Sequence, residues 1–334
     1  MSWRPTAPED FEVDEIPAYA PSGEGGHTLV RVEKRDCTTE EVARWLAHAA
    51  DVAPSEVGYA GRKDRTAIAR QWFSVPNLDP VRALQLELSR ARVLEAGRHP
   101  HKLRTGHLRG NTFAIAVRDV DAEATARAIA RLAEIARDGL PNRYGEQRFG
   151  RDGDNAARAV AVLAGRERVR DRRQARFLIS ALQSAVFNAV LAARPLPIGS
   201  VETGDVAVVH ASGGLFVVDD LVREAPRAAA FEISATGPIF GSRVLEAAGT
   251  AAQRERAALV AFDLDPDAMP TPPRGIRLYG ARRPFRVPVP DAVVDSSDAG
   301  VLRLRFTLPP GSYATVLIEE LLQPDDALPE AGLS

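Results

Sequence analysis

Clustered and alternating apolar positions predict four strands along the chain. Residues 27–36 (HTLVRVEKRD) carry the β-favouring Leu29, Val30 and Val32 before the pattern gives way to charge. The other segments with a strand pattern are residues 71–75, 111–117 and 301–308. From Ile198 onward, short apolar runs broken by Gly and Asp indicate a further β-rich segment.

Apolar residues at helical spacing predict seven helices. Thr38 or Thr39 can cap the first helix, which has an acidic first turn. Its apolar stripe consists of Val42, Trp45, Leu46 and Ala49, so Trp45 is expected to reach the core. Further helices are expected over residues 80–90, 121–138 with a stop at Gly139, 155–163, 174–193 and 247–262, and after the turn PPGSYATV.

The change of pattern along the chain indicates that one domain is inserted into another. The pattern of strands and helices in the first half gives way after about residue 165 and returns near residue 281. We therefore expect a mixed α/β domain that is interrupted by an inserted domain over roughly residues 165–280.

Composition places the chain among ordinary globular proteins. Of its 334 residues, 45% are hydrophobic and 26% are charged, enough to bury a full core. The single cysteine, Cys37, excludes an internal disulfide framework and suits a reducing cytosol. The N-terminal stretch lacks the apolar core of a signal peptide, and no apolar run approaches the length of a membrane span. We expect a cytoplasmic protein with no membrane partner.

Charge is distributed unevenly, although the formal net charge is only -2. Residues 1–57 hold 5 Lys and Arg against 12 Asp and Glu, whereas residues 58–118 hold 12 against 4. Residues 142–176 are again rich in arginine. A habit of using arginine in place of lysine explains the residue type but not the clustering. The clustering predicts a concave basic face that meets phosphates.

The stretch GYAGRKDRTA places a lone aspartate, Asp64, among Arg62, Lys63 and Arg65. Neighbouring cations favour the charged form of a carboxyl group, which suits a nucleophile or an electrostatic stabiliser better than a proton donor. The alternative is an ion-pair cluster on the surface that has no chemical role. Lys63 is one of only three lysines among 43 basic residues.

Metal and cofactor sites find no support in the sequence. His99, His101 and His107 lie close in sequence, but they lack a Cys pair or an acidic ligand, so a loop that faces solvent or phosphate is favoured over zinc. The glycines at 23–26 lack nucleotide-loop spacing, and no Gly-x-Ser-x-Gly elbow occurs. We expect no metal and no cofactor.

Several blocks together resemble the D family of tRNA pseudouridine synthases (TruD). GYAGRKDRTAIARQWFSV resembles the family signature, and PEDFEVDEIP resembles its N-terminal motif. Four further blocks resemble the family and stand with these two in the family's order along the chain: GEGGHTLVRVEKRDCTTEEVARWLA, HKLRTGHLRGNTFAIAVRDV, GLPNRYGEQRFG and LPPGSYATVLIEEL. The resemblance spans residues 7–322 and is loose only over the middle of the chain.

The resemblance implies a fold and a domain division. The fold is the pseudouridine synthase catalytic fold, of mixed α/β class, with a bent and mostly antiparallel sheet that an inserted second domain interrupts. Residues 1–167 and 279–334 would form the catalytic domain, and residues 168–278 the inserted domain. The molecule would be V-shaped with a basic cleft.

The resemblance also implies a reaction. The family isomerises uridine to pseudouridine, at position 13 of certain tRNAs, in a base that is flipped out of the stack. The glycosidic bond breaks, the uracil turns and rejoins through C5, and no cofactor or metal is needed. Asp64 aligns with the catalytic aspartate. Attack on C1′, attack on C6 and abstraction of a proton at C2′ all remain open, and each requires an ionised carboxylate.

Further site residues follow from the same motifs. Phe11 matches an aromatic residue that packs on the uracil, and Asn142 matches a residue that binds the target nucleotide, where an amide can read the uracil edge. Tyr313 matches an aromatic near the substrate. Tyr144, Gln147 and Arg148 lie in the loop block of Asn142 and are expected to bind substrate. Tyr144 and Tyr313 stand where phenylalanine is familiar in bacterial members, so the roles of their hydroxyl groups are open.

Basic residues are expected to grip the RNA. Lys63 can pair with Asp64 if the chain turns at Gly61, or it can meet a phosphate or the local backbone. Phosphate contacts are expected from a loop-rich segment that contains Arg98, Lys102, Arg104 and Arg109. The run 166–176 either grips phosphates from the second wall of the cleft or is a solvated helix face. The partner is expected to be tRNA, bound by a monomer.

Two other functions compete with a synthase. An RNA-binding module could have kept the fold and lost the chemistry, but the presence of Phe11, Asp64 and Asn142 together argues against such decay. A hydrolase that uses Asp64 on a glycosidic bond would need a second, opposed carboxylate. Glu146 is a remote candidate for it.

Overall fold

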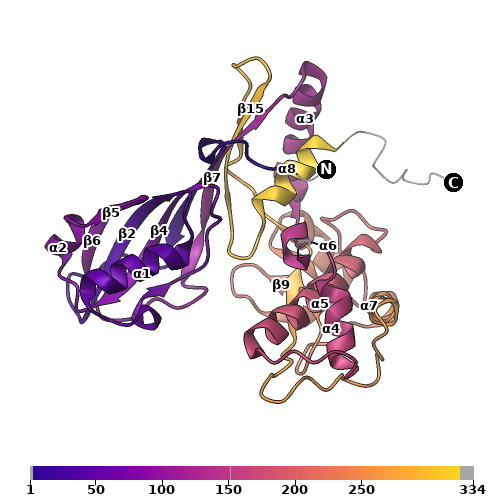
Figure 1. The fold of residues 1–334 in the computed structure, drawn as a ribbon. Coiled ribbons are helices and arrows are strands. Elements are labelled where there is room, and N and C mark those ends of the chain that lie inside the picture. The colour runs from indigo at the N-terminus through magenta and orange to yellow at the C-terminus, as the bar shows by residue number, and fades with distance from the viewer. Residues whose placement is uncertain (1–2, 151, 324–334) are drawn as a thin grey trace.

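The chain forms a sheet-rich lobe and a second lobe that is rich in helices (Figure 1). The computed structural model describes residues 3–150 and 152–323. Residues 1–2 and 324–334, which were assigned to the catalytic domain, lie outside the described part. The mixed α/β class with mostly antiparallel sheets is confirmed. The V shape, the basic cleft and the domain boundaries stay predictions.

The larger sheet contains nine strands within the described residues, in the order β14-β15-β7-β1-β4-β2-β6-β5 with β3 paired to β4. β1 and β4 pair in parallel, and the other neighbours pair antiparallel. The strands are β1 (Phe11–Pro17), β2 (His27–Arg35), β3 (Gly58–Tyr59), β4 (Ile68–Pro76), β5 (Glu87–Leu88), β6 (Ala91–His99), β7 (Leu108–Arg118), β14 (Val293–Asp295) and β15 (Val301–Leu308). The period of two points Phe11, Val13 and Glu15 to the buried side.

Helix α1 (Thr39–Ala50) packs on strands β2 and β4. The hydroxyl of Thr38 accepts from the backbone N–H of Glu41, and the carboxylate of Glu41 accepts from the N–H of Thr38. This capping box fixes the start of the helix. Leu46 is fully buried, whereas Trp45 is half-buried at the edge of the same core. The short helix α2 (Pro80–Leu84) lies beside β6.

Helices α3 (Ala122–Asp138) and α8 (Ala314–Leu322) pack together on the other half of the sheet. α3 ends where Gly139 adopts a φ of 93°. The core beneath the two helices contains Phe11, Phe113 and Phe306. Phe11 begins β1 at the border of this core, and the same border opens to the candidate site.

The second lobe packs four helices around a four-stranded sheet in the order β10-β9-β11-β12, as far as the structure describes the chain. Its elements are α4 (Asn155–Leu163), α5 (Arg172–Ala192), β9 (Val206–Val209), β10 (Leu215–Val217), α6 (Leu221–Ala229), β11 (Ile233–Ile239), α7 (Gly249–Ala261) and β12 (Ala281–Pro284). Its hydrophobic core runs from Ala156 to Phe285. Strand β13 (Arg286–Val287) pairs with β8 (Leu140–Pro141) beside this lobe.

Helix α5 is long and apolar enough to cross a membrane by length and composition alone. This corrects the expectation that no apolar run approaches that length. More than half of its apolar window, 56%, is buried inside the protein. Leu178, Leu182 and Phe187 face the core of the second lobe. Core helices of globular proteins pass the same test, and the absence of a membrane partner stays a prediction.

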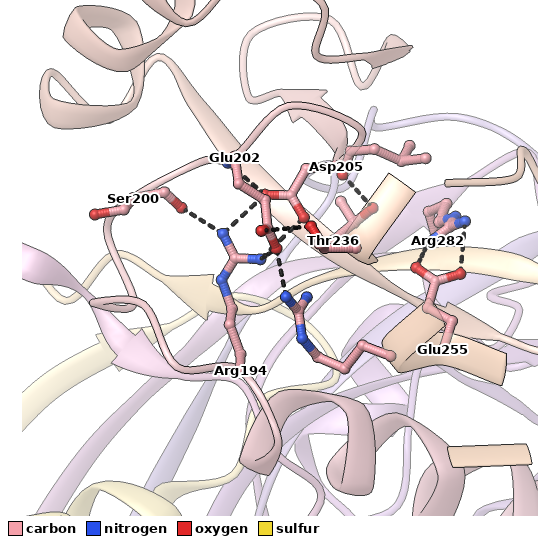
Figure 2. Close-up of polar contacts among 10 residues, drawn as sticks. Arg194, Ser200, Glu202, Asp205, Thr236, Glu255 and Arg282 are labelled. Carbon is pink, nitrogen blue, oxygen red and sulfur yellow. Dashed lines mark hydrogen bonds and ion pairs between the residues drawn. The ribbon is translucent and has the colours of Figure 1, made fainter. Parts of the chain in front are cut away.

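A buried ion network holds the second lobe together (Figure 2). The guanidinium of Arg194 donates to both carboxylate oxygens of Asp205, at 2.9 and 2.8 Å, and to the carbonyl of Ser200 at 3.0 Å. The side chains of Arg194 and Asp205 are 1% and 2% exposed. A bidentate pair of this kind is stable inside a protein only when both charges are satisfied together.

Some strands and helices differ from those predicted from the sequence. Residues 80–90 do not form one helix: α2 ends at Leu84, and β5 then turns back to pair with β6. The prediction failed because the hairpin depends on pairing across the sheet and not on the local pattern. Strands β1 and β6 and helix α6 were missed; β1 and β6 carry several charged residues, which weakens the alternation of apolar positions.

Candidate active site

Two adjoining cavities meet at Asp64. The smaller has a volume of about 260 Å³ and is lined by Phe11, Lys63, Asp64, Asn111, Phe113, Gln147 and Tyr313, among others. The larger, of about 520 Å³, shares Phe11, Asp64 and Gln147 and adds Arg4, Glu146 and Glu319, among others. Of the predicted site residues, Phe11, Asp64, Gln147 and Tyr313 therefore come together around one space.

The side chains in this space come from distant parts of the chain. Phe11 begins β1, Asp64 lies in the loop between β3 and β4, and Phe113 lies on β7. Strands β1 and β7 pair, with Phe11 opposite Ile115 and Val13 opposite Phe113. Tyr313 immediately precedes α8. The large sheet therefore fixes the aromatic residues relative to the Asp64 loop.

Three fully buried polar side chains hold the Asp64 loop in place. The hydroxyl of Thr39 accepts from the backbone N–H of Lys63 at 3.0 Å, and Gln71 donates to the carbonyl of Gly61 at 3.3 Å. The ammonium of Lys34 donates to the backbone carbonyls of Asp64 and Cys37, each at 2.6 Å. Lys34, Thr39 and Gln71 are 0% exposed. The loop is thus fixed by buried contacts, which pre-organise its aspartate.

The cations next to Asp64 in sequence are bound to other carboxylates. Arg62 pairs with Glu40 at 2.6 Å, and Arg65 pairs with Glu41 at 3.0 Å. This arrangement corrects the expectation that all three flanking cations hold Asp64 ionised. Within the described residues, no hydrogen bond or ion pair reaches the Asp64 carboxylate. Its two oxygens are therefore available to a ligand.

Lys63 is committed to the protein interior. Its ammonium pairs with Glu15 at 2.9 Å and donates to the side-chain oxygen of Asn111 at 2.5 Å. The Lys63 and Glu15 side chains are 7% and 1% exposed. This pairing corrects the expectation of a direct Lys63–Asp64 pair, a phosphate contact or a bond to the local backbone. Lys63 acts on Asp64 only through its charge.

Burial is the largest influence on the pKa of Asp64. The residue is exposed at the mouth of the cavities, yet the protein atoms around its carboxyl group remove enough solvent to raise its pKa above the ordinary value. Lys34 and Lys63 oppose this rise through their charge. Burial also lowers the pKa of Lys34. Loss of solvent therefore outweighs the cations, and the carboxylate is less well stabilised than in water, which makes it a better nucleophile.

Aromatic rings line the space beside Asp64. The rings of Phe11 and Phe113 lie 5.9 Å apart, and Tyr144 stands edge-on to Tyr313 at 5.9 Å. Desolvation raises the pKa of the Tyr313 phenol, so it stays protonated at neutral pH. An uncharged planar ligand suits such walls, because aromatic rings favour stacked or edge contacts.

Asn142 does not line either cavity. It is 4% exposed, its amide nitrogen donates to the carbonyl of Pro284 at 2.9 Å, and its amide oxygen accepts from Arg283 at 2.5 Å. The protein uses both ends of its amide, and the expectation that Asn142 binds the target nucleotide stays a prediction. Asn142 joins its loop to β12.

Tyr144 and Arg148 stand behind the cavity wall. The guanidinium of Arg283 lies 4.1 Å from the centre of the Tyr144 ring. Arg148 donates to the hydroxyls of Ser180 and Ser184 on α5, at 2.7 and 3.2 Å. Neither Tyr144 nor Arg148 lines the two cavities. Their contacts hold the loop that carries Gln147, and the substrate contacts expected of them stay predictions.

The four residues predicted to contact phosphates differ in whether other protein groups bind their side chains. Arg104 and Arg109 are exposed, and no ion pair reaches either within the described residues. Arg98 lies 3.7 Å from Asp79, and Lys102 donates to the carbonyl of Ser55 at 2.6 Å. Arg98 and Arg109 lie on β6 and β7, which corrects their placement in a loop-rich segment.

Sequence reasoning missed Asn111 and Phe113, which line the smaller cavity. A signal for them was present, because the alternation of residues 111–117 puts Asn111 and Phe113 on one face of their strand. Lys34 and Glu15 gave no such signal. Each is a charged residue in a strand, and only the folded sheet brings them to Asp64 and Lys63.

The chain is similar to known proteins along nearly its whole length. A family model described as tRNA pseudouridine synthase D (TruD) matches residues 5–170 and 167–321. A protein named tRNA pseudouridine synthase D from Thermus thermophilus is 43% identical, with 95% of this chain and 87% of that protein covered. One of the same name from Geobacter metallireducens is 38% identical, with 94% and 93% covered.

A solved structure shares the fold. The crystal structure of a protein from Methanosarcina mazei, whose title names it a tRNA pseudouridine synthase D, superposes with a TM-score of 0.74. The superposition covers 95% of this chain and 92% of the chain from Methanosarcina mazei, and the two sequences are 22% identical. This similarity supports the fold described above.

Proposed function

The chain belongs to the tRNA pseudouridine synthase D family, and on that premise we propose that Asp64 is the group that isomerises a uridine of tRNA to pseudouridine. The observation that carries the proposal is the carboxylate of Asp64, which no protein group binds within the described residues, beside a cavity with aromatic walls. The site in tRNA that the family resemblance implies, position 13, is part of the same proposal.

The reaction needs a reactive oxygen and a closed space. The bond from C1′ to N1 breaks, a bond from C1′ to C5 forms, and the hydrogen on C5 leaves while N1 gains one, so the product is an isomer. Attack at C1′, attack at C6 and removal of the C2′ proton all begin with an ionised Asp64. The free uracil must turn without escaping, and the walls of Phe11, Phe113 and Tyr313 support its retention.

Polar groups in the cavity support recognition of uracil. The ammonium of Lys63 donates to the oxygen of Asn111, which orients the amide nitrogen of Asn111 as the free donor. We assign this N–H group to a carbonyl of the base, in addition to the nucleotide contact predicted for Asn142. Gln147, which lines both cavities, supplies a second amide.

The direct test uses the Asp64→Asn variant on an unmodified tRNA transcript. We expect pseudouridine formation, measured by mass spectrometry of the nucleosides, to fall by at least roughly a thousandfold while tRNA binding stays near wild type. Normal product formation by this variant would remove Asp64 from the chemistry. The matched control is Asp79→Asn, because Asp79 is an exposed carboxylate away from both cavities.

Deuterium at C2′ of the target uridine separates the three routes. Removal of the C2′ proton predicts a primary isotope effect on single-turnover isomerisation, whereas attack at C1′ or C6 leaves the C2′ bond intact. The route through C6 instead predicts a small inverse effect with deuterium at C6, because that carbon changes from trigonal to tetrahedral.

The position of Glu146 supports a second candidate function, the hydrolysis of a glycosidic bond. It is exposed and lines the larger cavity together with Asp64. Hydrolysis with two carboxylates would release free uracil and leave an abasic site. We expect Glu146→Gln to keep isomerisation and to release no uracil. Release of uracil by the wild-type protein, lost in Glu146→Gln, would establish the hydrolase.

A further inference from the structure

Six arginines at the start of the second lobe have no partner in the protein. All six are exposed, and within residues 3–150 and 152–323 none of their guanidinium groups makes an ion pair or a hydrogen bond. Nearby Arg158, by contrast, pairs with Glu167 at 2.8 Å. The six, together with Phe177, are called the arginine face here: Arg166, Arg168, Arg170, Arg172, Arg173 and Arg176.

The position of the arginine face on α5 works against helix stability. The carboxylate of Asp171 caps α5 by accepting from the backbone N–H of Arg173, but the first turn itself has no acidic residue and carries Arg172 and Arg173. Helix α1, in contrast, has Glu40 and Glu41 in its first turn. Cations at a helix N-terminus are repelled by the macrodipole. Clustered arginines that the fold neither pairs nor needs indicate an anionic partner.

An exposed aromatic ring completes the face. Phe177 is 45% exposed, one turn into α5 beyond these cations. The guanidinium of Arg148 lies over its ring, 5.9 Å from the centre. Arg148 is anchored to Ser180 and Ser184 on α5 and follows Gln147, which lines both cavities at Asp64. The ring is therefore connected to the candidate active site through consecutive residues.

We propose that the arginine face binds an unpaired segment of the substrate RNA, with a nucleobase stacked on Phe177 and neighbouring phosphates on the arginines. This inference rests on the proposed function, because it names the RNA surface of that same site. Single-stranded segments suit it, since only unpaired bases expose a face for stacking. A protein partner is disfavoured because one ring among six cations offers little apolar area.

The stacking test measures binding in the Asp64→Asn background, where no product forms. Anisotropy of a labelled tRNA transcript reports the dissociation constant. We expect Phe177→Ala and Phe177→Leu to weaken binding by about tenfold and Phe177→Trp to keep it, because leucine is apolar but cannot stack. The matched control is Val260→Ala on α7, which removes an exposed apolar side chain (59%) far along the chain.

The charge test compares two triple variants over a range of salt concentrations. Arg172, Arg173 and Arg176, all changed to Gln, should reduce the slope of log binding constant against log salt by about two units. The control changes Arg137, Arg256 and Arg303 to Gln, because these exposed arginines are paired with Asp138, Asp267 and Asp298. The control slope should stay closer to wild type.

The outcomes separate this inference from the proposed function. If the wild-type protein makes pseudouridine but Phe177→Leu binds RNA like wild type, no base stacks on Phe177 and the inference is wrong. An unchanged salt slope in the Arg172, Arg173, Arg176 variant would equally overturn it. If the wild-type protein makes no pseudouridine, the proposed function fails, whatever the binding data show.

Discussion

Two carboxylates of this protein, Asp205 in the second lobe and Asp64 in the pocket, have opposite surroundings. Asp205 is bound by both arms of Arg194, and the rest of the network is paired as well (Figure 2). Asp64 lies near several cations, and each of them is bound elsewhere. A charge that the fold pairs serves stability, whereas a charge that the fold surrounds but leaves unpaired is available for chemistry.

Glu255 sharpens the contrast, because burial raises its pKa as it raises that of Asp64. The guanidinium of Arg282 meets both oxygens of Glu255, at 2.5 and 3.1 Å, and opposes the rise. Asp64 receives only the longer-range charge of Lys34 and Lys63. Burial without a partner is what distinguishes a functional carboxylate from a structural one.

The largest expected effects come from two variants, one that removes the partner of Asp205 and one that removes the charge of Asp64. Arg194→Ala leaves Asp205 buried and unpaired, so the free energy of unfolding should fall by about 3–5 kcal/mol, with little change in the activity of the folded fraction. Asp64→Asn should do the reverse, removing activity without lowering stability. Urea unfolding followed by circular dichroism measures the first effect. An Arg194→Ala protein as stable as wild type would break the comparison.

Removing Lys34 should give the next largest effect. Lys34→Met deletes the donor to the Asp64 carbonyl together with a buried cation that stabilises the Asp64 carboxylate, so kcat should fall roughly 10- to 100-fold. The acidic limb of the pH–rate profile should also move to higher pH in this variant, because one cation that stabilises the Asp64 carboxylate is gone. The matched control is Lys102→Met, since Lys102 also donates to a carbonyl but lies away from the pocket. Equal effects of the two variants would refute a positioning role for Lys34.

The pH dependence of the wild-type protein gives a third measure. Because the folded-state pKa of Asp64 is raised, the carboxylate forms above the ordinary value of 3.8, and kcat/KM should fall through an acidic limb that lies above pH 3.8. A raised carboxyl pKa also means that stability decreases as pH rises through it. Asp64→Asn should therefore gain stability over wild type only above that limb. A limb at or below pH 3.8 would contradict the shift.

The smallest expected effect concerns the other basic surface. Arg104→Ala and Arg109→Ala should each reduce the salt slope of tRNA binding by about 0.7–0.9, because neither guanidinium is paired within the described part of the chain. Lys102→Ala should change the slope less, since its ammonium already donates to the carbonyl of Ser55. Equal slopes for all three variants would show that protein contacts do not predict phosphate contacts here.

Local patterns predicted those elements whose ends and faces are encoded nearby. α3 was predicted because Asp121 caps it, Gly139 ends it and the apolar stripe between them is strong. α4 was predicted over the same residues that the structure shows, 155–163. The helix over residues 80–90 failed, because Glu87 and Leu88 gain more by pairing with β6 than by continuing a helical turn.

The sequence by itself determined the residue types, the family resemblance and Asp64 as the candidate nucleophile. Tertiary structure decided which charges stay free: it pairs Arg62, Lys63 and Arg65 with glutamates, brings Lys34 to the Asp64 backbone and sets Asn111 in the cavity. The physical reason is that charge pairing and desolvation depend on distance in space. Neighbours in sequence therefore give no reliable account of either.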